Sequence, residues 1–242
     1  MPFLLDESSG ITLYKQLEKI IIEKIEGGEW PVDTKLPTEA QLCEMYGVSR
    51  ITVRQTLNNL KSEGYLYRKQ GKGTFVCRPK LVQNLGHFYS FSTEIEKMGC
   101  KPGSTILNFS VVEADYELSN NLKIAEKDRV YAVRRLRLAD GEPIAVETSW
   151  IPRAVAPGLV QDDIKKYGLY RALARILGRS PNWGEESFEA VLMNREEALA
   201  LRARAKDAAL RLTRLAYADS TPVEYCVSII RGDKYIYKIE LQ

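Results

Sequence analysis

Arginine, glutamine and hydroxyl side chains cluster within seven positions near residue 50 of this 242-residue chain. Arg50 and Arg54 provide planar forks of hydrogen-bond donors, and Gln55 provides an amide that donates and accepts. An arginine fork pairs with the O6 and N7 atoms of guanine, and glutamine pairs similarly with adenine. Ser49 and Thr52 add hydroxyl groups suited to phosphate oxygens. These residue types at this spacing predict a surface that contacts double-stranded DNA.

The basic charge of the chain is concentrated next to this cluster. The whole chain has a net charge of only +3, whereas residues 50–80 carry eight Lys and Arg against one Glu. Residues 1–49 carry four basic and nine acidic residues, and the remainder is nearly balanced. A concentrated basic block is the electrostatic footprint of a protein that contacts phosphate backbones. The charge distribution alone fits a solvated surface equally well. The helices and strands that carry the basic residues must therefore decide between a solvated surface and one that contacts DNA.

Helical periodicity places the polar cluster at the start of a third helix. Apolar residues recur at helical spacing over residues 12–27, which predicts a first helix that ends at two glycines. Thr38 and Gln41 have the spacing of a capping box, so a second helix begins there and ends at Gly47. Ser49 then caps the third helix after a short turn. In a helix-turn-helix, the first turn of the recognition helix enters the major groove.

Two short strands follow, over residues 65–68 and 74–77, and they enclose a basic, glycine-rich loop. The tip of this loop consists of Gln70, Gly71 and Lys72. Glycine lets the backbone approach a groove closely, and lysine releases counterions from DNA. The sequence therefore predicts a winged DNA-binding domain.

The stretch over residues 36–76 resembles the winged helix-turn-helix of GntR-type bacterial transcriptional regulators. The resemblance covers about residues 10–78. It implies that the polar residues of the third helix and of the wing tip contact an operator, with Thr38 and Glu39 beside the DNA backbone. Many family members carry arginine where this chain has Ala40, so the operator sequence does not carry over with the resemblance.

Residues 79–88 contain a proline and a glycine, and we interpret them as a linker. They separate a DNA-binding domain at 1–78 from a second domain at 89–242, in which the residue pattern differs. In the second domain, β-branched and aromatic runs alternate with short helical segments, which predicts an α+β domain around a mixed, largely antiparallel sheet. Strands are expected over residues 105–112, 130–138, 144–151, 187–192, 210–217, 223–230 and 235–241. Short helices are expected near residues 93–98, 169–177 and 196–203.

A faint internal repeat at an offset of 79 residues lies within the second domain. Residues 135–144 parallel residues 214–223, and each segment contains a predicted strand, an Ala-Asp turn, a proline and the start of another strand. Two similar hairpins in one sheet predict a duplicated fold with a pocket between its halves. Chance similarity of two hairpin turns explains the repeat equally well.

Three arginines, Arg134, Arg135 and Arg137, fall within one predicted strand. Strand alternation puts Arg135 and Arg137 on one face and Arg134 on the other. Buried arginines need anionic partners, and Glu147 on the next strand is a candidate. A two-residue loop at Asp140 pairs Glu147 with Arg134, whereas a three-residue loop pairs it with Arg135. The alternative to a buried site is an exposed cross-strand ion pair.

Hydroxyl-bearing residues precede the short helix expected near residue 93 and surround Phe91; they are Ser90, Ser92 and Thr93. Hydroxyls and unpaired backbone N–H groups at a helix start form a phosphate cradle. An ordinary helix cap is the commoner use of such residues.

Residues 134–152 and 221–237 resemble the UTRA effector-binding domain of the HutC branch of GntR regulators, which has the chorismate-lyase-like fold. The likeness covers roughly residues 85–242. It implies a cytoplasmic homodimer, joined through this domain, that loosens its hold on DNA when it binds a small metabolite. It favours the register that pairs Arg135 with Glu147, and Gly168 stands where some relatives have a phosphate-binding serine. The residues it implies for effector binding are Ser90, Phe91, Ser92, Thr93, Arg135, Arg137, Glu147, Tyr170, Glu224 and Arg231.

Other functional classes lack their usual signatures. The cysteines are widely scattered and His87 is the only histidine, so we expect no metal site and no histidine-dependent catalytic triad. The P-loop and dinucleotide-binding motifs are absent, so no cofactor is expected. No apolar run approaches the roughly 20 residues of a membrane span, and no signal peptide is expected.

We therefore expect a cytoplasmic repressor that binds a pseudo-palindromic operator as a homodimer and is released by a small anionic metabolite. An amino-sugar phosphate is the first expectation for this effector, followed by other sugar phosphates, phosphonates and histidine-pathway acids. An enzyme with a lyase-like domain and a constitutive DNA-binding protein are the alternative functions.

Overall fold

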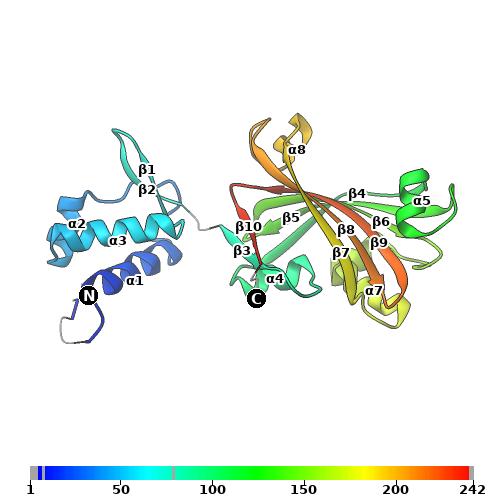
Figure 1. Ribbon diagram of the computed structural model, residues 1–242, viewed down its shortest axis with the longest axis horizontal. Helices are drawn as coiled ribbons and strands as arrows, with labels where there is room; N and C mark the ends of the chain where they lie inside the picture. Colours follow the sequence, from blue (N-terminus) through cyan, green and yellow to red (C-terminus); the bar gives the residue numbers. More distant parts are fainter. Residues whose placement is uncertain (1–4, 7–8, 78–79, 240–242) are drawn as a thin grey trace. The chain divides into compact units, whose positions relative to one another are not determined.

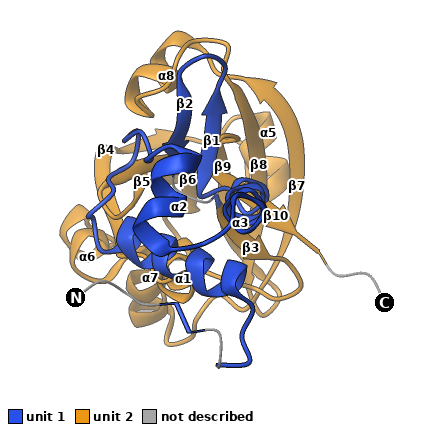
Figure 2. Ribbon diagram, turned by 90° about the vertical axis from the view of Figure 1, so that its left-hand side faces the viewer, with its two compact units in different colours: residues 1–80 blue, residues 81–242 orange. Residues whose placement is uncertain are grey.

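The computed structural model describes residues 5–6, 9–77 and 80–239 and forms two compact units. The N-terminal unit comprises residues 1–80 and the C-terminal unit residues 81–242, which are coloured separately in Figure 2. Residues 78 and 79, at the predicted domain boundary, lie outside the described residues. Each unit contains its own buried apolar core.

A helix-turn-helix and a wing form the N-terminal unit, as predicted (Figure 1). The elements are α1 (Leu13–Glu26), α2 (Glu39–Tyr46), α3 (Arg50–Ser62), β1 (Leu66–Lys69) and β2 (Gly73–Val76). Leu17 and Ile21 of α1 pack with Leu42 of α2 and Leu60 of α3, and all four side chains are fully buried. This core holds α3 with its polar side exposed.

Side-chain caps set the helix starts that the sequence predicts. Thr38 accepts a hydrogen bond from the Gln41 backbone N–H at 3.3 Å, and the Gln41 side chain accepts one from the Thr38 N–H at 2.8 Å. Gly47 ends α2 with φ at 66°, in the left-handed region that glycine adopts without strain. Ser49 then caps α3 by accepting from the Thr52 N–H at 3.2 Å. Local sequence therefore fixes the turn between α2 and α3.

An antiparallel six-stranded sheet in the order β4-β5-β6-β9-β8-β7 forms the centre of the C-terminal unit. Its strands are β4 (Pro102–Glu113), β5 (Arg129–Ala139), β6 (Glu142–Pro152), β7 (Trp183–Leu192), β8 (Ala208–Ala218) and β9 (Thr221–Arg231). The helices are α4 (Phe91–Lys97), α5 (Tyr116–Leu122), α6 (Gln161–Tyr167), α7 (Leu169–Leu177) and α8 (Arg195–Ala200). The predicted α+β class is confirmed, although α5 and α6 were not predicted.

Helices cover both faces of this sheet. On one face, Val133 of β5 packs with Leu173 of α7 and with residues of α6. On the other face, Val130 of β5 packs with Leu118 of α5, and Ile229 of β9 packs with residues of α8. Because side chains alternate along a strand, the position of each residue in the strand determines which group of helices it faces.

Residues 81–84 form a strand, which corrects the prediction that residues 79–88 are a linker. This strand, β3 (Leu81–Asn84), pairs in parallel with β10 (Tyr235–Lys238). The buried side chain of Gln83 accepts a hydrogen bond from the Tyr235 hydroxyl at 2.5 Å, across 152 positions of the chain. No local pattern can reveal a strand whose partner lies so far away. The predicted last strand ends earlier than expected, and its residues 240 and 241 lie outside the described residues.

The six-stranded sheet consists of two copies of one strand–helix–strand–strand unit. The first copy is β4-α5-β5-β6 and the second is β7-α8-β8-β9. Asp140 and Asp219, at the 79-residue offset, occupy the two hairpin turns with positive φ values of 49° and 55°. Each hairpin also has a register shift just before its turn. The repeat is therefore a structural duplication, in which Arg135 and Arg214 occupy equivalent positions.

Candidate functional site

Helix α3 and its cap residue carry half of the residues predicted to contact DNA. Arg50, Arg54 and Gln55 are exposed, and Thr52 is half-buried. The hydroxyl oxygens of Ser49 and Thr52 lie 2.9 Å apart, because Ser49 caps the helix at this point. The helix thus presents two arginine forks and one amide on its outer surface, with the hydroxyls at its first turn.

An ion pair joins α2 to α3 at this surface. The Arg54 Nε donates to a carboxylate oxygen of Glu39 at 2.9 Å. This bond leaves the two terminal nitrogens of Arg54 for a second partner, which is the geometry of a bidentate contact with guanine. A carboxylate repels phosphate, so Glu39 is suited to orient Arg54 rather than to bind the DNA backbone.

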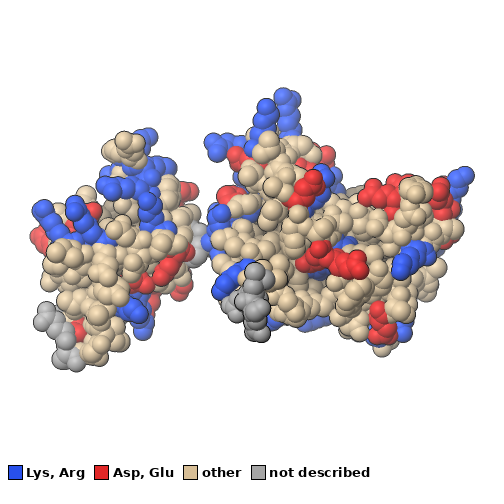
Figure 3. Space-filling model, in the orientation of Figure 1, with Lys and Arg blue, Asp and Glu red and all other residues tan. Residues whose placement is uncertain are grey.

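The wing carries its exposed basic charge at the tip. Lys69 lies over two aromatic rings of the hairpin, 5.2 Å from the Tyr67 centroid and 4.9 Å from the Phe75 centroid. The exposed turn contains the predicted contacts Gln70, Gly71 and Lys72. Figure 3 shows Lys and Arg side chains gathered around this hairpin. Lys69 is therefore engaged within the wing, whereas the side chain of Lys72 faces solvent.

A cavity of about 160 Å³ lies on the face of the sheet that α6 and α7 cover. Side chains of β5, β6, β8 and β9 line it together with the first residues of α4 and α7. Since β6 and β9 are neighbours, the cavity lies where the two copies of the duplication meet. Nine of the ten residues predicted to bind the effector line this cavity: Ser90, Phe91, Ser92, Thr93, Arg135, Arg137, Glu147, Tyr170 and Glu224.

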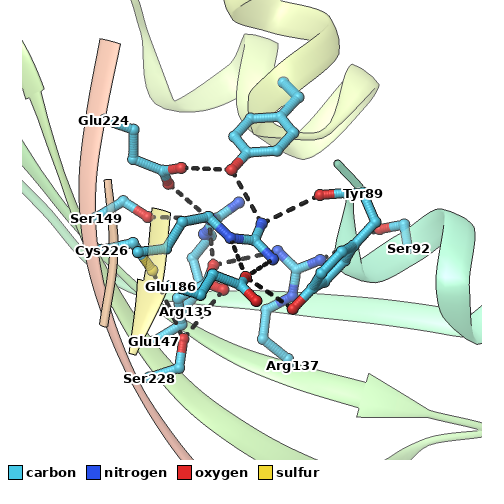
Figure 4. A network of polar contacts seen from close by, with 12 residues as sticks. Tyr89, Ser92, Arg135, Arg137, Glu147, Ser149, Glu186, Glu224, Cys226 and Ser228 are labelled. Carbon is cyan, nitrogen blue, oxygen red and sulfur yellow. Dashed lines mark hydrogen bonds and ion pairs between the residues drawn. The ribbon is translucent and has the colours of Figure 1, made fainter. Parts of the chain in front are cut away.

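Arg135 and Arg137 share one carboxylate in this cavity (Figure 4). Arg135 forms a short ion pair with Glu147, and Arg137 lies 3.5 Å from the same carboxylate oxygen. Arg135 also donates to the Ser149 hydroxyl, and Arg137 donates to the Ser92 hydroxyl, each at 3.2 Å. The register that the sequence left open therefore places Arg135 opposite Glu147.

Burial and neighbouring charges oppose each other at these groups. Burial alone would raise the pKa of Glu147, but Arg135 and Arg137 lower it below its ordinary value. Burial lowers the pKa of Arg137 to about 10, although Glu147 opposes this shift. The pKa of Arg135 is raised, because Glu147 and Glu224 together outweigh its burial. Arg137 is therefore the arginine with the less complete counter-charge.

Two donors beside the shared carboxylate have no hydrogen-bond partner within the described chain. They are the Nε atoms of Arg135 and Arg137, and both are buried. Leaving a buried donor unsatisfied costs about 1–3 kcal/mol, and more when the group is charged. Two arginines that line the cavity therefore each carry a buried donor without a partner in the described chain.

Arg214 is a third arginine of the cavity, and it was not predicted. Its Nε and Nη2 lie 2.6 and 2.5 Å from one oxygen of Glu186. Its Nη1 donates to the Tyr89 carbonyl and to the Tyr170 hydroxyl, each at 3.1 Å. Every nitrogen of this guanidinium is engaged, unlike those of Arg135. The internal repeat was the signal that could have found it, because Arg214 is the counterpart of Arg135.

Glu224 completes the polar lining of the cavity. Its carboxylate accepts a hydrogen bond from the Tyr170 hydroxyl at 2.7 Å and lies 4.0 Å from Arg135. Burial and the neighbouring Glu224 raise the pKa of Tyr170 well above its ordinary value, so its hydroxyl stays protonated at neutral pH. With Glu147 and Glu186, this carboxylate is one of three that pair with the buried arginines Arg135, Arg137 and Arg214.

Arg231 lies outside the cavity, which corrects its predicted role. Its guanidinium pairs with Asp233 at 2.6 Å and donates to the Leu201 carbonyl at 3.2 Å, beside α8. Arg231 is an odd number of residues from Glu224 on the same strand, so alternation places the two side chains on opposite faces.

The residues before α4 serve mainly as a helix cap. Ser90 accepts from the Thr93 N–H at 3.2 Å, and the two hydroxyl oxygens lie 2.7 Å apart. Phe91 and Ser92 instead contact Arg137, whose guanidinium lies 4.6 Å from the Phe91 ring centroid. This segment therefore positions Arg137 at the cavity.

Among the residues that the structure describes, no group of three His, Cys, Asp or Glu side chains could hold a metal ion. None of the described helices is both long and apolar enough to cross a membrane.

Comparison with known proteins matches both units. Residues 13–76 match the family of bacterial regulatory proteins called gntR, and residues 97–236 match the UTRA domain. The chain is 32% identical to the transcriptional repressor NagR of Bacillus subtilis over 96% of each protein. It is 27% identical to the histidine utilization repressor of Pseudomonas putida over 92% of this chain and 89% of that one.

Two further matches cover the chain to different extents. The mannosyl-D-glycerate transport/metabolism system repressor MngR of Escherichia coli is 34% identical over 69% of this chain and 71% of its own length. The crystal structure of PhnF from Mycobacterium smegmatis aligns with 96% of this chain and 99% of that chain. Its TM-score is 0.76 at 25% identity.

Proposed function

Because the chain belongs to the gntR family of bacterial regulatory proteins and carries a UTRA domain, it is a ligand-responsive transcriptional repressor, and we propose that its effector is a small phosphate-bearing metabolite. The names of the relatives refer to different metabolites: one names mannosyl-D-glycerate, and another names the utilization of histidine. Family membership therefore leaves the effector open, and the chemistry of the cavity must select it.

The unsatisfied Nε donors of Arg135 and Arg137 carry this proposal. These two arginines share the single carboxylate of Glu147, whereas Arg214 has the carboxylate of Glu186 to itself. An anion bound beside the sharing pair would gain charge-assisted hydrogen bonds without displacing a fully engaged partner. We assign this part of the cavity to the anionic group of the effector.

The start of α7 favours phosphate over carboxylate. Gly168 precedes α7 and supplies no side-chain cap, and the first residues of α7 line the cavity. Backbone N–H groups at a helix start bind phosphate oxygens well, and a phosphate has enough oxygens to reach both α7 and the arginines. Gly168 stands where some relatives have a serine, and it adds no side chain beside these backbone groups.

The carboxylates of Glu147 and Glu224 select the rest of the effector. Carboxylates accept hydrogen bonds from hydroxyl and ammonium groups. A cavity of about 160 Å³ admits a molecule of the size of a monosaccharide rather than a long chain. An amino-sugar phosphate fits these requirements best, with other sugar phosphates next.

On the DNA side, we infer a cytoplasmic homodimer, joined through the C-terminal unit, that binds a pseudo-palindromic operator. One recognition helix reads a short half-site, and a two-fold dimer presents two such helices. The contacts we assign are Arg50, Thr52, Arg54 and Gln55 of α3, and Lys72 of the wing. The effector releases DNA only if it prefers a dimer geometry that DNA disfavours, so DNA must weaken effector binding by the same factor, typically about 5–150-fold.

A thermal-shift screen on the full-length protein tests the effector class. Glucosamine 6-phosphate, glucose 6-phosphate, a methylphosphonate and urocanate are compared at equal concentration. We expect the amino-sugar phosphate to raise the Tm most, because it fits the requirements of the cavity best. A ligand at 100 times its Kd stabilises the native state by about 2.7 kcal/mol. Arg137→Met should abolish the shift, whereas Arg211→Met, which removes an exposed pair with Glu189, should retain it. Stabilisation by urocanate alone would overturn the phosphate assignment.

The pH dependence of binding provides a second test. A phosphate monoester gains its second negative charge with a pKa near 6, whereas a carboxylate has a constant charge above pH 5. The pKa of Glu147 is lowered, and the pKa values of Tyr170 and Cys226 are raised. Between about pH 5.5 and 7.5, Glu147 therefore stays ionised and the other two groups stay protonated. The affinity for the effector should therefore rise over this interval, and a flat profile would contradict a phosphate effector.

A further inference from the structure

Arg214 contacts the segment of the C-terminal unit that connects β3 to α4. This segment, residues 85–89, lies between β3 and α4. Arg214 donates to the Tyr89 carbonyl at 3.1 Å, and its guanidinium lies 4.1 Å from the Tyr89 ring centroid and 5.7 Å from that of Phe88. The Tyr89 hydroxyl donates to Glu186, the carboxylate partner of Arg214, at 2.8 Å. Arg214 and Glu186 therefore fix the end of this segment by several contacts at once.

The same guanidinium connects through Tyr170 to the carboxylate of Glu224 on the neighbouring strand β9. Arg214 donates to the Tyr170 hydroxyl at 3.1 Å, and Tyr170 donates to Glu224 at 2.7 Å. A continuous series of hydrogen bonds therefore runs from Glu224 through Tyr170 and Arg214 to the Tyr89 carbonyl. Because all of these groups are buried or lie at the cavity, a change at one end alters the partner available to the next.

A second cavity of about 410 Å³ lies beyond this series. All of residues 85–89 line it together with Glu186, and Tyr89 and Arg214 line both cavities. These two side chains thus lie between the effector cavity and a space beside residues 85–89. This space gives the segment room to change position when its contacts with Arg214 change.

We propose that Arg214 is a positioning residue that couples occupation of the effector cavity to residues 85–89. A hydroxyl or ammonium group of the effector that binds Glu224 replaces the Tyr170 hydroxyl as its donor. Tyr170 and Arg214 then change position, and the contacts between Arg214 and Tyr89 change. Arg214 itself does not bind the anion, because Glu186 already neutralises it. This inference rests on the proposed function only in placing the effector against Glu224.

Hydrogen–deuterium exchange on the full-length protein, with glucosamine 6-phosphate as the probe, tests this coupling. The test variant is Arg214→Met with Glu186→Leu, which removes both charges and leaves no lone buried carboxylate. The matched control is Arg211→Met with Glu189→Leu, which removes an exposed ion pair between the same two strands. In wild type and control, the probe should change exchange in residues 85–90 by a factor of about 5–150. In the test variant this change should fall below about twofold, while the Kd for the probe stays within about tenfold of wild type.

A second variant, Tyr170→Phe, separates coupling from simple support of the segment. It removes the hydroxyl that connects Glu224 to Arg214 but leaves the bond from Arg214 to Tyr89. Exchange of residues 85–90 without the probe should match wild type, and the response should be lost even at a probe concentration that saturates the variant.

Three results would overturn the proposal. A probe-induced change that persists in the test variant would show that coupling bypasses Arg214. A loss of probe affinity beyond about fiftyfold, in a variant that remains folded, would make Arg214 an anion ligand instead. The third is measured without any probe: equal exchange of residues 85–90 in the test variant, the control and wild type would show that Arg214 does not hold the segment. If wild type fails to bind the probe, the proposed effector is wrong. The comparison without probe still decides whether Arg214 holds residues 85–89 in place, on which the coupling depends.

Discussion

The arginines of the two units lie in opposite environments. Arg54 on α3 keeps 68% of its side chain exposed and shares one ion pair with Glu39, whereas Arg135 on β5 keeps only 4% exposed and faces two carboxylates. An exposed arginine remains hydrated until DNA arrives, and it contributes one contact among many. A buried arginine has already lost its water, so its partners must be present before the ligand binds.

This difference predicts how each site responds to substitution. In the N-terminal unit, each side chain should contribute a moderate and nearly independent share of operator binding, because the contacts are separated and solvated. In the C-terminal unit, the groups form one network in which a single loss leaves another charge unpaired. We therefore expect large, coupled effects in the cavity and smaller, additive effects on α3 and the wing.

The largest effect should come from Arg135→Ala. It removes a buried charged donor that we assign to the anionic group of the effector, so it should weaken effector binding by about 2–5 kcal/mol, the usual cost of truncating one partner of a buried charged contact. Operator affinity without effector should stay near wild type, because the residue lies outside the DNA-binding unit. Calorimetry with the effector and a mobility-shift titration with the operator measure the two quantities. If the variant still releases DNA at the wild-type effector concentration, Arg135 does not belong to the effector site.

Arg54→Ala should produce the next largest effect, on DNA rather than on effector. The loss of a bidentate base contact should cost about 1–3 kcal/mol of operator binding and relax sequence preference at one position of each half-site. Selection of binding sites from a random DNA pool, followed by mobility-shift titration, measures both. Unchanged affinity and unchanged preference would remove Arg54 from the base-reading surface.

Glu39→Gln tests whether the carboxylate orients Arg54. The glutamine retains a hydrogen-bond acceptor but loses the charge, so operator affinity should fall by about 1 kcal/mol or less. Sequence preference at the position read by Arg54 should weaken, and the effect should vanish when Arg54 is already alanine. A double-mutant cycle measured by mobility shift checks this, and full additivity would contradict an orienting role.

At high salt, Lys72→Ala should change binding less than the other three substitutions do. An exposed lysine at the wing tip contributes to phosphate contact, so its loss should weaken all DNA sequences alike and reduce the salt slope of binding by about 1. Titrations at several salt concentrations with operator and unrelated DNA measure this slope. A loss confined to the operator would instead indicate a base contact from the wing.

Sequence predicted the N-terminal unit closely because its boundaries depend on local chemistry. The capping box of Thr38 and Gln41, the left-handed Gly47 and the Ser49 cap all lie within twelve residues. Each signal acts between residues three or four positions apart, so it can be read without knowing the fold. The polar side of α3 follows from helical spacing in the same way.

The cavity was predicted only in part. Strand alternation alone placed Arg135 and Arg137 on one face, and the family resemblance favoured Glu147 as the partner of Arg135. The resemblance also implied Arg231, which alternation along β9 places on the opposite face from Glu224. Arg214 was missed because its partners, Glu186 and Tyr89, lie on other elements, 28 and 125 positions away.

The sequence by itself thus determined the two-part organisation, the starts of α2 and α3, the polar side of α3 and the identity of the paired strand arginines. The tertiary structure decided that β3 joins the end of the chain, that the Glu147 register places it opposite Arg135, and that Arg214 bridges the effector cavity and residues 85–89. The reason is physical. Caps and helical faces depend on neighbours along the chain, whereas the neutralisation of a buried charge depends on strand register and on groups that meet only when the sheet closes over them.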